Sequence, residues 1–183
     1  MKGKTMRYLI VLAITALFVA GITIASAPAQ NKYMGNKKCV MCHKGAAKGA
    51  IFEKWQSTPH ANAYKTLATP EAKAVYAKLN KTGDPQKDAA CLKCHVTGFG
   101  ADTSRTAALD ITEGVTCEAC HGAGTAYGKM NVMKDKAASV AAGMVEKPEA
   151  GCVTCHNNQS PTYKPFVYAD AWAKIAHKGP APK

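Results

Sequence analysis

Residues 117–121 read CEACH, a pair of cysteines two residues apart that is followed at once by a histidine. The same pattern occurs three more times, as CVMCH at 39–43, CLKCH at 91–95 and CVTCH at 152–156. The four copies account for all eight cysteines of the 183-residue chain. Cys-x-x-Cys-His is the motif to which c-type haem is attached, because its two thiols add to the haem vinyl groups and its histidine ligates the iron. The pattern therefore predicts four covalently attached haem c groups.

Each predicted haem site assigns two cofactor-binding thiols and one proximal iron ligand. The thiols are those of Cys39, Cys42, Cys91, Cys94, Cys117, Cys120, Cys152 and Cys155, and the proximal ligands are His43, His95, His121 and His156. Two other interpretations exist for an exported chain with eight cysteines, a disulfide scaffold and a set of zinc sites. Neither explains why a histidine directly follows every cysteine pair, so haem attachment is the favoured interpretation.

The first 29 residues have the pattern of a secretory signal peptide. The basic start consists of Lys2, Lys4 and Arg7, and an apolar run follows at residues 8–24. The small-x-small cleavage site is Ala27-Pro28-Ala29. The sequence thus predicts a cleaved signal peptide at 1–29 and one mature domain at 30–183, exported to the periplasm or beyond. An uncleaved membrane anchor is the alternative, although the apolar run is slightly short for a span of about 20 residues.

The composition favours a helical fold whose core depends on cofactors. Helices are predicted at 46–55, 60–67, 71–79, 131–142 and 170–176, and no strand of convincing length is found. The apolar residues are mostly alanine, with few large aliphatic side chains, so the chain alone cannot easily build a full core. The predicted fold class is mainly α with long irregular loops, a compact multihaem cytochrome c fold organised around four covalently bound haems.

The formal net charge of +12 raises the question of a nucleic-acid partner. An exported chain rarely meets nucleic acid, and the lysines are scattered rather than clustered. Each haem carries two propionates, so four haems would add about eight negative charges that offset most of the excess of lysine. The basic composition is therefore explained by the cofactors, and no nucleic-acid partner is expected.

The remaining histidines are too few to complete four six-coordinate haems. The chain has six histidines, so only His60 and His177 are left as second axial ligands. Either could instead be a plain surface histidine. Methionine is the other common axial ligand, and Met130 and Met133 lie shortly after the third motif. Met133 is narrowly preferred over Met130, and the alternative for both is gap-filling in the core.

The residues around the motifs resemble those of the tetrahaem cytochrome c-554 family, known from ammonia-oxidising bacteria. The matching stretches are KKCVMCHK at 37–44, Trp55 with Thr58 and HANA at 60–63, CLKCHVTGFG at 91–100, GVTCEACHGAG at 114–124, and a last CVTCH followed by a proline-containing loop and a histidine. The resemblance extends over nearly the whole mature chain, and its flanking residues are more specific than the haem motif alone.

The resemblance implies a ligand set. It pairs His60 with His121 on the third haem and His177 with His156 on the fourth, and it leaves the second haem, on His95, five-coordinate. For the first haem, on His43, the family places a histidine just after the third motif. This chain has KMNVM at 129–133 there, with Asn131 near the histidine position, so we hypothesise that Met133 or Met130 replaces it.

Three functions are open at this point. The favoured one is electron transfer between redox protein partners, because the chain shows no set of acid–base groups for a substrate and four haems on about 154 residues must lie close together. Association with the membrane surface or with a membrane quinone-linked complex is left open, and no small-molecule substrate is required. The alternatives are an enzyme whose open haem binds or reduces a small nitrogen oxide, and a subunit of a haem filament or larger complex.

Overall fold

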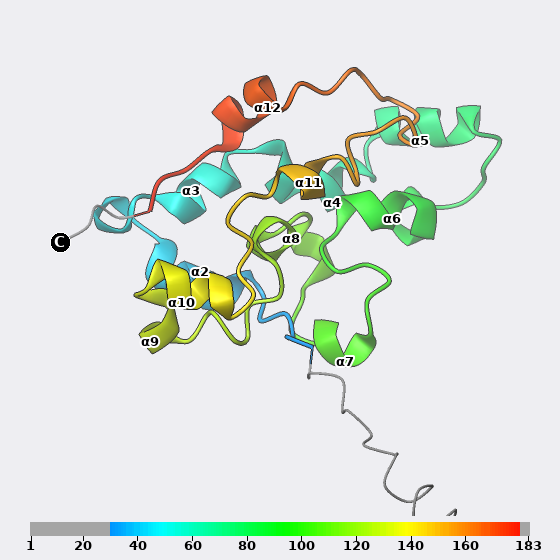
Figure 1. Ribbon diagram of the computed structural model, residues 1–183. Coiled ribbons are helices and arrows are strands. Elements are labelled where there is room, and N and C mark those ends of the chain that lie inside the picture. Colours follow the sequence, from blue (N-terminus) through cyan, green and yellow to red (C-terminus); the bar gives the residue numbers. More distant parts are fainter. Residues whose placement is uncertain (1–29, 180–183) are drawn as a thin grey trace, which may run out of the picture. The chain divides into compact units, whose positions relative to one another are not determined.

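The computed structural model describes residues 30–179. Within the described residues the secondary structure is entirely helical (Figure 1), which confirms the predicted class. The elements are α2 (Asn36–His43), η1 (Ala46–Lys48), α3 (Ile51–Gln56), η2 (Pro59–Asn62), α4 (Ala63–Thr66), α5 (Pro70–Lys78), η3 (Pro85–Lys87), α6 (Ala89–His95), α7 (Thr103–Thr106), η4 (Ile111–Glu113), α8 (Cys117–His121), α9 (Met130–Met133), α10 (Lys136–Ala141), α11 (Glu149–Cys152) and α12 (Tyr168–Ile175).

Three of the four haem motifs lie within short helices. Motifs one and two end α2 and α6, motif three is α8 itself, and motif four begins at the last residue of α11. Helical geometry suits these motifs, because two cysteines three positions apart project from the same side of a helix. The Asp88 carboxylate caps α6 by accepting a hydrogen bond from the Ala90 N–H at 2.7 Å, which fixes where the second motif begins.

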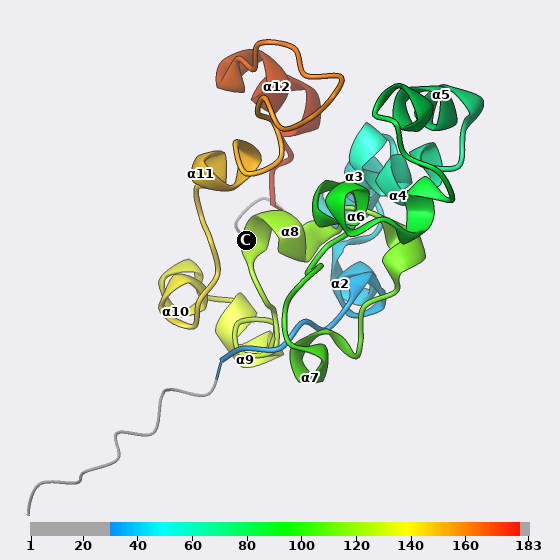
Figure 2. The same cartoon turned by 90° about the vertical axis from the view of Figure 1, so that its right-hand side faces the viewer.

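The helix α8 lies between α2 and α11 in both views of the molecule (Figures 1 and 2) and packs against each of them. The helix α4 packs against α6, and α9 packs against α10. The third motif is therefore the central one, with the first motif on one side of it and the start of the fourth on the other.

Two predicted helices are broken by non-helical residues, and a third, at 60–67, is found as η2 followed directly by α4. The expected helix at 46–55 divides into η1 and α3, because Gly49 and Ala50 between them adopt the left-handed conformation. The expected helix at 131–142 divides into α9 and α10, because the Asp135 carboxylate accepts a hydrogen bond from the Ala138 N–H at 2.9 Å and starts a new helix. The helix predicted at 71–79 is found as α5.

The protein core is small. Only seven apolar residues are buried among those described, and these are Ala61, Leu67, Tyr76, Leu92, Val96, Ala123 and Tyr127. Leu67, Leu92 and Val96 form one cluster, while Met41 is 70% exposed and Val167 57% exposed. The chain thus leaves much of its apolar surface uncovered, as the shortage of large aliphatic residues predicts.

The predicted signal peptide at 1–29 lies outside the described residues. Across residues 30–179, the helices are all too short and too polar to span a bilayer.

Candidate haem sites

Two of the proximal histidines are held in a fixed orientation by backbone carbonyls. The His95 Nδ1 lies 2.7 Å from the Ala63 carbonyl oxygen, and the His121 Nδ1 lies 3.2 Å from the Val145 carbonyl oxygen. A carbonyl at this distance accepts the Nδ1 proton, which leaves Nε2 unprotonated and free to bind a metal. Both histidines therefore have the arrangement of a metal ligand supported by its second coordination shell.

One predicted distal histidine faces a proximal one from motif four. The ring centres of His60 and His156 are 6.1 Å apart at an interplanar angle of 76°. Burial, together with the nearby His156, lowers the pKa of His60 and so favours the neutral imidazole that binds metals. Phe166 stacks on His156 with ring centres 4.8 Å apart, so an aromatic residue that the sequence did not single out holds this ligand in place.

The segment that carries His60 is anchored just ahead of motif three. The His60 carbonyl accepts a hydrogen bond from the Val115 N–H at 3.1 Å, and the Trp55 Nε1–H donates to the Val115 carbonyl at 2.8 Å. Gly114 packs so closely that a Cβ there would lie 2.8 Å from the His60 carbonyl oxygen. Trp55 thus belongs to the framework that positions His60.

The second predicted distal histidine faces the proximal histidine of motif three. The ring centres of His121 and His177 are 5.9 Å apart at an interplanar angle of 53°, and His177 lies just after the end of α12. Burial lowers the pKa of His177, and the neighbouring His121 and His43 lower it further. Burial, His121 and Lys48 also lower the pKa of His43, so His43, His121 and His177 share one region.

The ring contacts in this structure differ from the pairing implied by the family resemblance. His60 was expected opposite His121 and His177 opposite His156, but the rings pair the other way, His60 with His156 and His177 with His121. The physical reason is tertiary packing: which histidine meets which depends on how η2, α12 and the motif helices dock. The structure still brings both predicted distal histidines to a proximal one.

The two methionines differ in their surroundings. Both lie on the short helix α9, but Met130 is 66% exposed whereas Met133 is partly buried. A side chain that is largely in solvent is poorly placed to be held as an axial ligand. Met133 therefore remains the better candidate, as the sequence suggests, and its ligation remains a prediction.

Cysteines from different motifs lie close together. All eight lie in the described part of the chain, and none of them is paired in a disulfide. A hydrogen bond to Cys117 and burial raise the pKa of the Cys39 thiol, and burial and the neighbouring Cys155 raise the pKa of Cys94 to about 11. Motif one therefore adjoins motif three, and motif two adjoins motif four.

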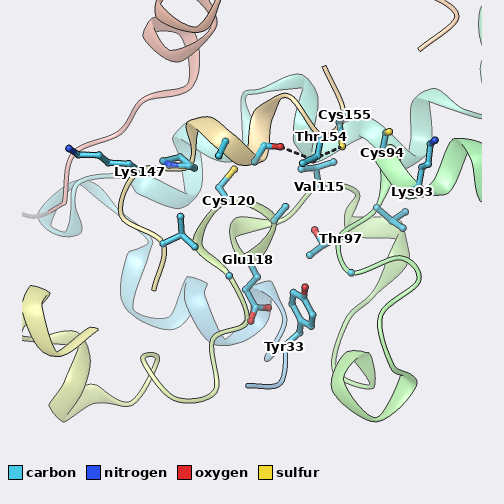
Figure 3. A pocket seen from close by; sticks show the side chains of 18 residues that line it. Tyr33, Lys93, Cys94, Thr97, Val115, Glu118, Cys120, Lys147, Thr154 and Cys155 are labelled. Atoms are coloured by element: carbon cyan, nitrogen blue, oxygen red, sulfur yellow. Dashed lines mark hydrogen bonds between the residues drawn. The ribbon is translucent and has the colours of Figure 1, made fainter. Parts of the chain in front are cut away.

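A cavity of about 460 Å³ opens between three of the motifs (Figure 3). Its lining includes Cys94, Cys120 and Cys155, together with Tyr33 and Thr97. This volume lies in the range of small-molecule and cofactor sites, which is roughly 300 to 1,000 Å³. In residues 30–179, no three His, Cys, Asp or Glu side chains gather closely enough to hold a metal ion.

Comparison with known proteins identifies the family of the chain. The family model described as "Cytochrome c554 and c-prime" matches residues 37–122. The cytochrome c-554 of Nitrosomonas europaea is 34% identical over 152 residues, which cover 73% of this chain and 61% of that protein. The chain thus spans about three fifths of the length of this relative.

A solved structure extends the likeness beyond the family model. The reduced state of cytochrome c554 from Nitrosomonas europaea matches with a TM-score of 0.56 and 28% identity, over 82% of this chain and 80% of that one. The resemblance noted in the sequence is thereby confirmed. The chain belongs to the cytochrome c554 family of c-type cytochromes, and this membership implies covalently bound haem c.

Proposed function

We propose that the chain is an exported tetrahaem cytochrome that transfers electrons between redox protein partners. The observation that carries the proposal is the presence of two histidine pairs whose ring centres are 6.1 Å and 5.9 Å apart. Two imidazoles that bind one metal from opposite sides each place a nitrogen about 2 Å from it, so their ring centres lie about 6 Å apart. The planes can rotate about the shared axis, so angles of 76° and 53° are compatible with ligation.

The arrangement of the motifs supports transfer within the chain. When bound, haem supplies reversible one-electron chemistry of iron. The thiols of Cys39 and Cys117 adjoin each other, as do those of Cys94 and Cys155, so groups attached there would lie near one another. The partners would then be protein electron donors and acceptors, and one of them could be a quinone-linked complex that the chain meets at the membrane surface.

The test is to count haems and electrons on the purified holoprotein. We expect the intact mass to exceed that of the mature chain by four haem groups. We also expect coulometric titration to take up four electrons reversibly, with no added substrate. Fewer than four haems, or electron uptake that is irreversible or catalytic, would contradict the proposal.

One observation keeps the enzyme alternative open. His60 and His177 both face other rings, so neither is available to His95. An iron on His95 could then keep an open position for a small nitrogen oxide. Nitric oxide added to the reduced protein should then give a nitrosyl signal from one haem in four.

A solution-sizing run tests the filament alternative, because a large assembly that persists on dilution would favour it.

The prediction about the first haem concerns Met133. The variant M133L keeps the size and apolar character of the side chain but removes the sulfur. If Met133 ligates the iron on His43, M133L should convert one low-spin haem to high spin and abolish the His/Met band in near-infrared magnetic circular dichroism. M130L is the matched control, because Met130 is 66% exposed, and it should leave the spectrum unchanged. An unchanged spectrum for M133L would make both methionines packing residues.

A further inference from the structure

A buried carboxylate lies inside motif three. Glu118 is only 2% exposed, although it occupies a variable position between the two cysteines of the motif. Its Oε1 accepts hydrogen bonds from the N–H groups of Met34 at 3.0 Å and Gly124 at 2.7 Å. Its Oε2 accepts from the N–H groups of Met34 at 3.2 Å and Gly35 at 2.9 Å. Figure 3 shows the side chain extending from α8 toward Tyr33.

These hydrogen bonds join the first motif to the third. Gly35 caps the start of α2, which carries motif one, and Gly124 lies in the turn after motif three. The contact is close-packed, because a Cβ at Gly124 would lie 2.7 Å from the Met34 sulfur and one at Gly128 only 2.5 Å from it. The α2 helix also packs against α8. A single side chain thus fixes the spacing of two motif helices.

The hydrogen bonds around Glu118 suit a carboxylate, which is an acceptor on both oxygens. Both oxygens accept hydrogen bonds, so neither is left to carry a proton toward a partner. Among residues 30–179, the ion pairs are Lys81 with Asp88 and Lys136 with Glu146, so no lysine or arginine pairs with Glu118. Backbone dipoles alone hold this negative charge in a region from which water is largely excluded.

We propose that Glu118 is a positioning residue that locks motifs one and three together, and that its fixed negative charge lowers the reduction potentials of the two haems bound there. Adding an electron beside a buried negative charge is unfavourable, and the interaction is strong where the effective dielectric constant is low. Glu118 directly follows Cys117, whose thiol adjoins Cys39, so both attachment sites lie within its field. The inference rests on the proposed haem content.

The test is a redox titration of E118Q, E118D and wild-type holoprotein, after the haem content of each has been counted. In E118Q the charge is lost and an NH₂ group faces backbone donors, so we expect lower thermal stability and higher potentials for two of the four haems. In E118D the charge is kept on a shorter side chain, so we expect lower stability with potentials near those of the wild type. The control E71Q makes the same change of net charge at an exposed glutamate in the first turn of α5 and should shift no haem selectively.

The outcomes separate the inference from the proposed function. A wild-type protein with fewer than four haems would contradict the function itself. Four haems with potentials unchanged in E118Q would overturn the inference alone, because a purely structural role alters stability and not potential. If E118Q does not fold, redox-induced infrared difference spectra of the wild type and E118D test the inference instead. We expect a carboxylate band that responds to reduction and differs between the two proteins, and the absence of such a band would overturn the inference.

Discussion

A chain produced without haem attachment is expected to lack a stable tertiary structure. The described residues bury only seven apolar side chains, and the largest cluster among them consists of Leu67, Leu92 and Val96. Ordering a backbone residue costs roughly 1 to 2 kcal/mol, and a chain of about 150 residues normally buries far more apolar surface to offset this cost. We therefore expect a variant with all eight cysteines changed to alanine to show no cooperative thermal transition and to lose at least half of the far-ultraviolet helix signal of the holoprotein.

A variant that lacks only one haem site provides the matched control. C152A/C155A removes the attachment thiols of motif four. This motif begins at the last residue of α11 (Figure 2). The other motifs of the variant retain the contact between α2 and α8. We expect three haems and a cooperative transition at a lower temperature than that of the wild type. A cooperative transition in the haem-free chain would contradict the prediction and show that the protein part folds by itself.

The helical class and the position of every motif were predictable because they depend on local chemistry. Cys-x-x-Cys-His is a covalent attachment sequence, and α5 follows from a proline at its first position and a side-chain cap from Thr69. The helix breaks at Gly49 and Asp135 were missed because helix-forming residues on both sides of each break support a continuous helix. Only the left-handed backbone at 49–50 and the capping hydrogen bond of Asp135 reveal the breaks.

The arrangement of the sites was less predictable because it depends on tertiary packing. In the sequence, Glu118 cannot be told from a solvent-exposed helical glutamate, since its partners Met34 and Gly35 lie more than 80 positions away. Tertiary packing also decides which partners His60 and His177 meet. The count of histidines shows that they are needed as ligands, but not which proximal ring each one meets.

Replacing either distal histidine by alanine is expected to convert one haem from low spin to high spin. H60A should remove the ligand opposite His156, and H177A the ligand opposite His121. Each variant should lose one bis-histidine haem in low-temperature magnetic circular dichroism. Added imidazole should restore the low-spin signal, because a free ligand can occupy the space left by the deleted ring. Failure of imidazole to restore the signal would point to a folding defect instead.

The C152A/C155A background tests which histidine serves which haem. This background lacks the fourth haem, so the structure predicts that adding H60A creates no further high-spin centre. Adding H177A should still create one, because its partner His121 belongs to motif three. The family-based pairing predicts the reverse result for each variant. A new high-spin centre with H60A and none with H177A would therefore restore the pairing of His60 with His121, and the ring contacts seen here would not be ligand pairs.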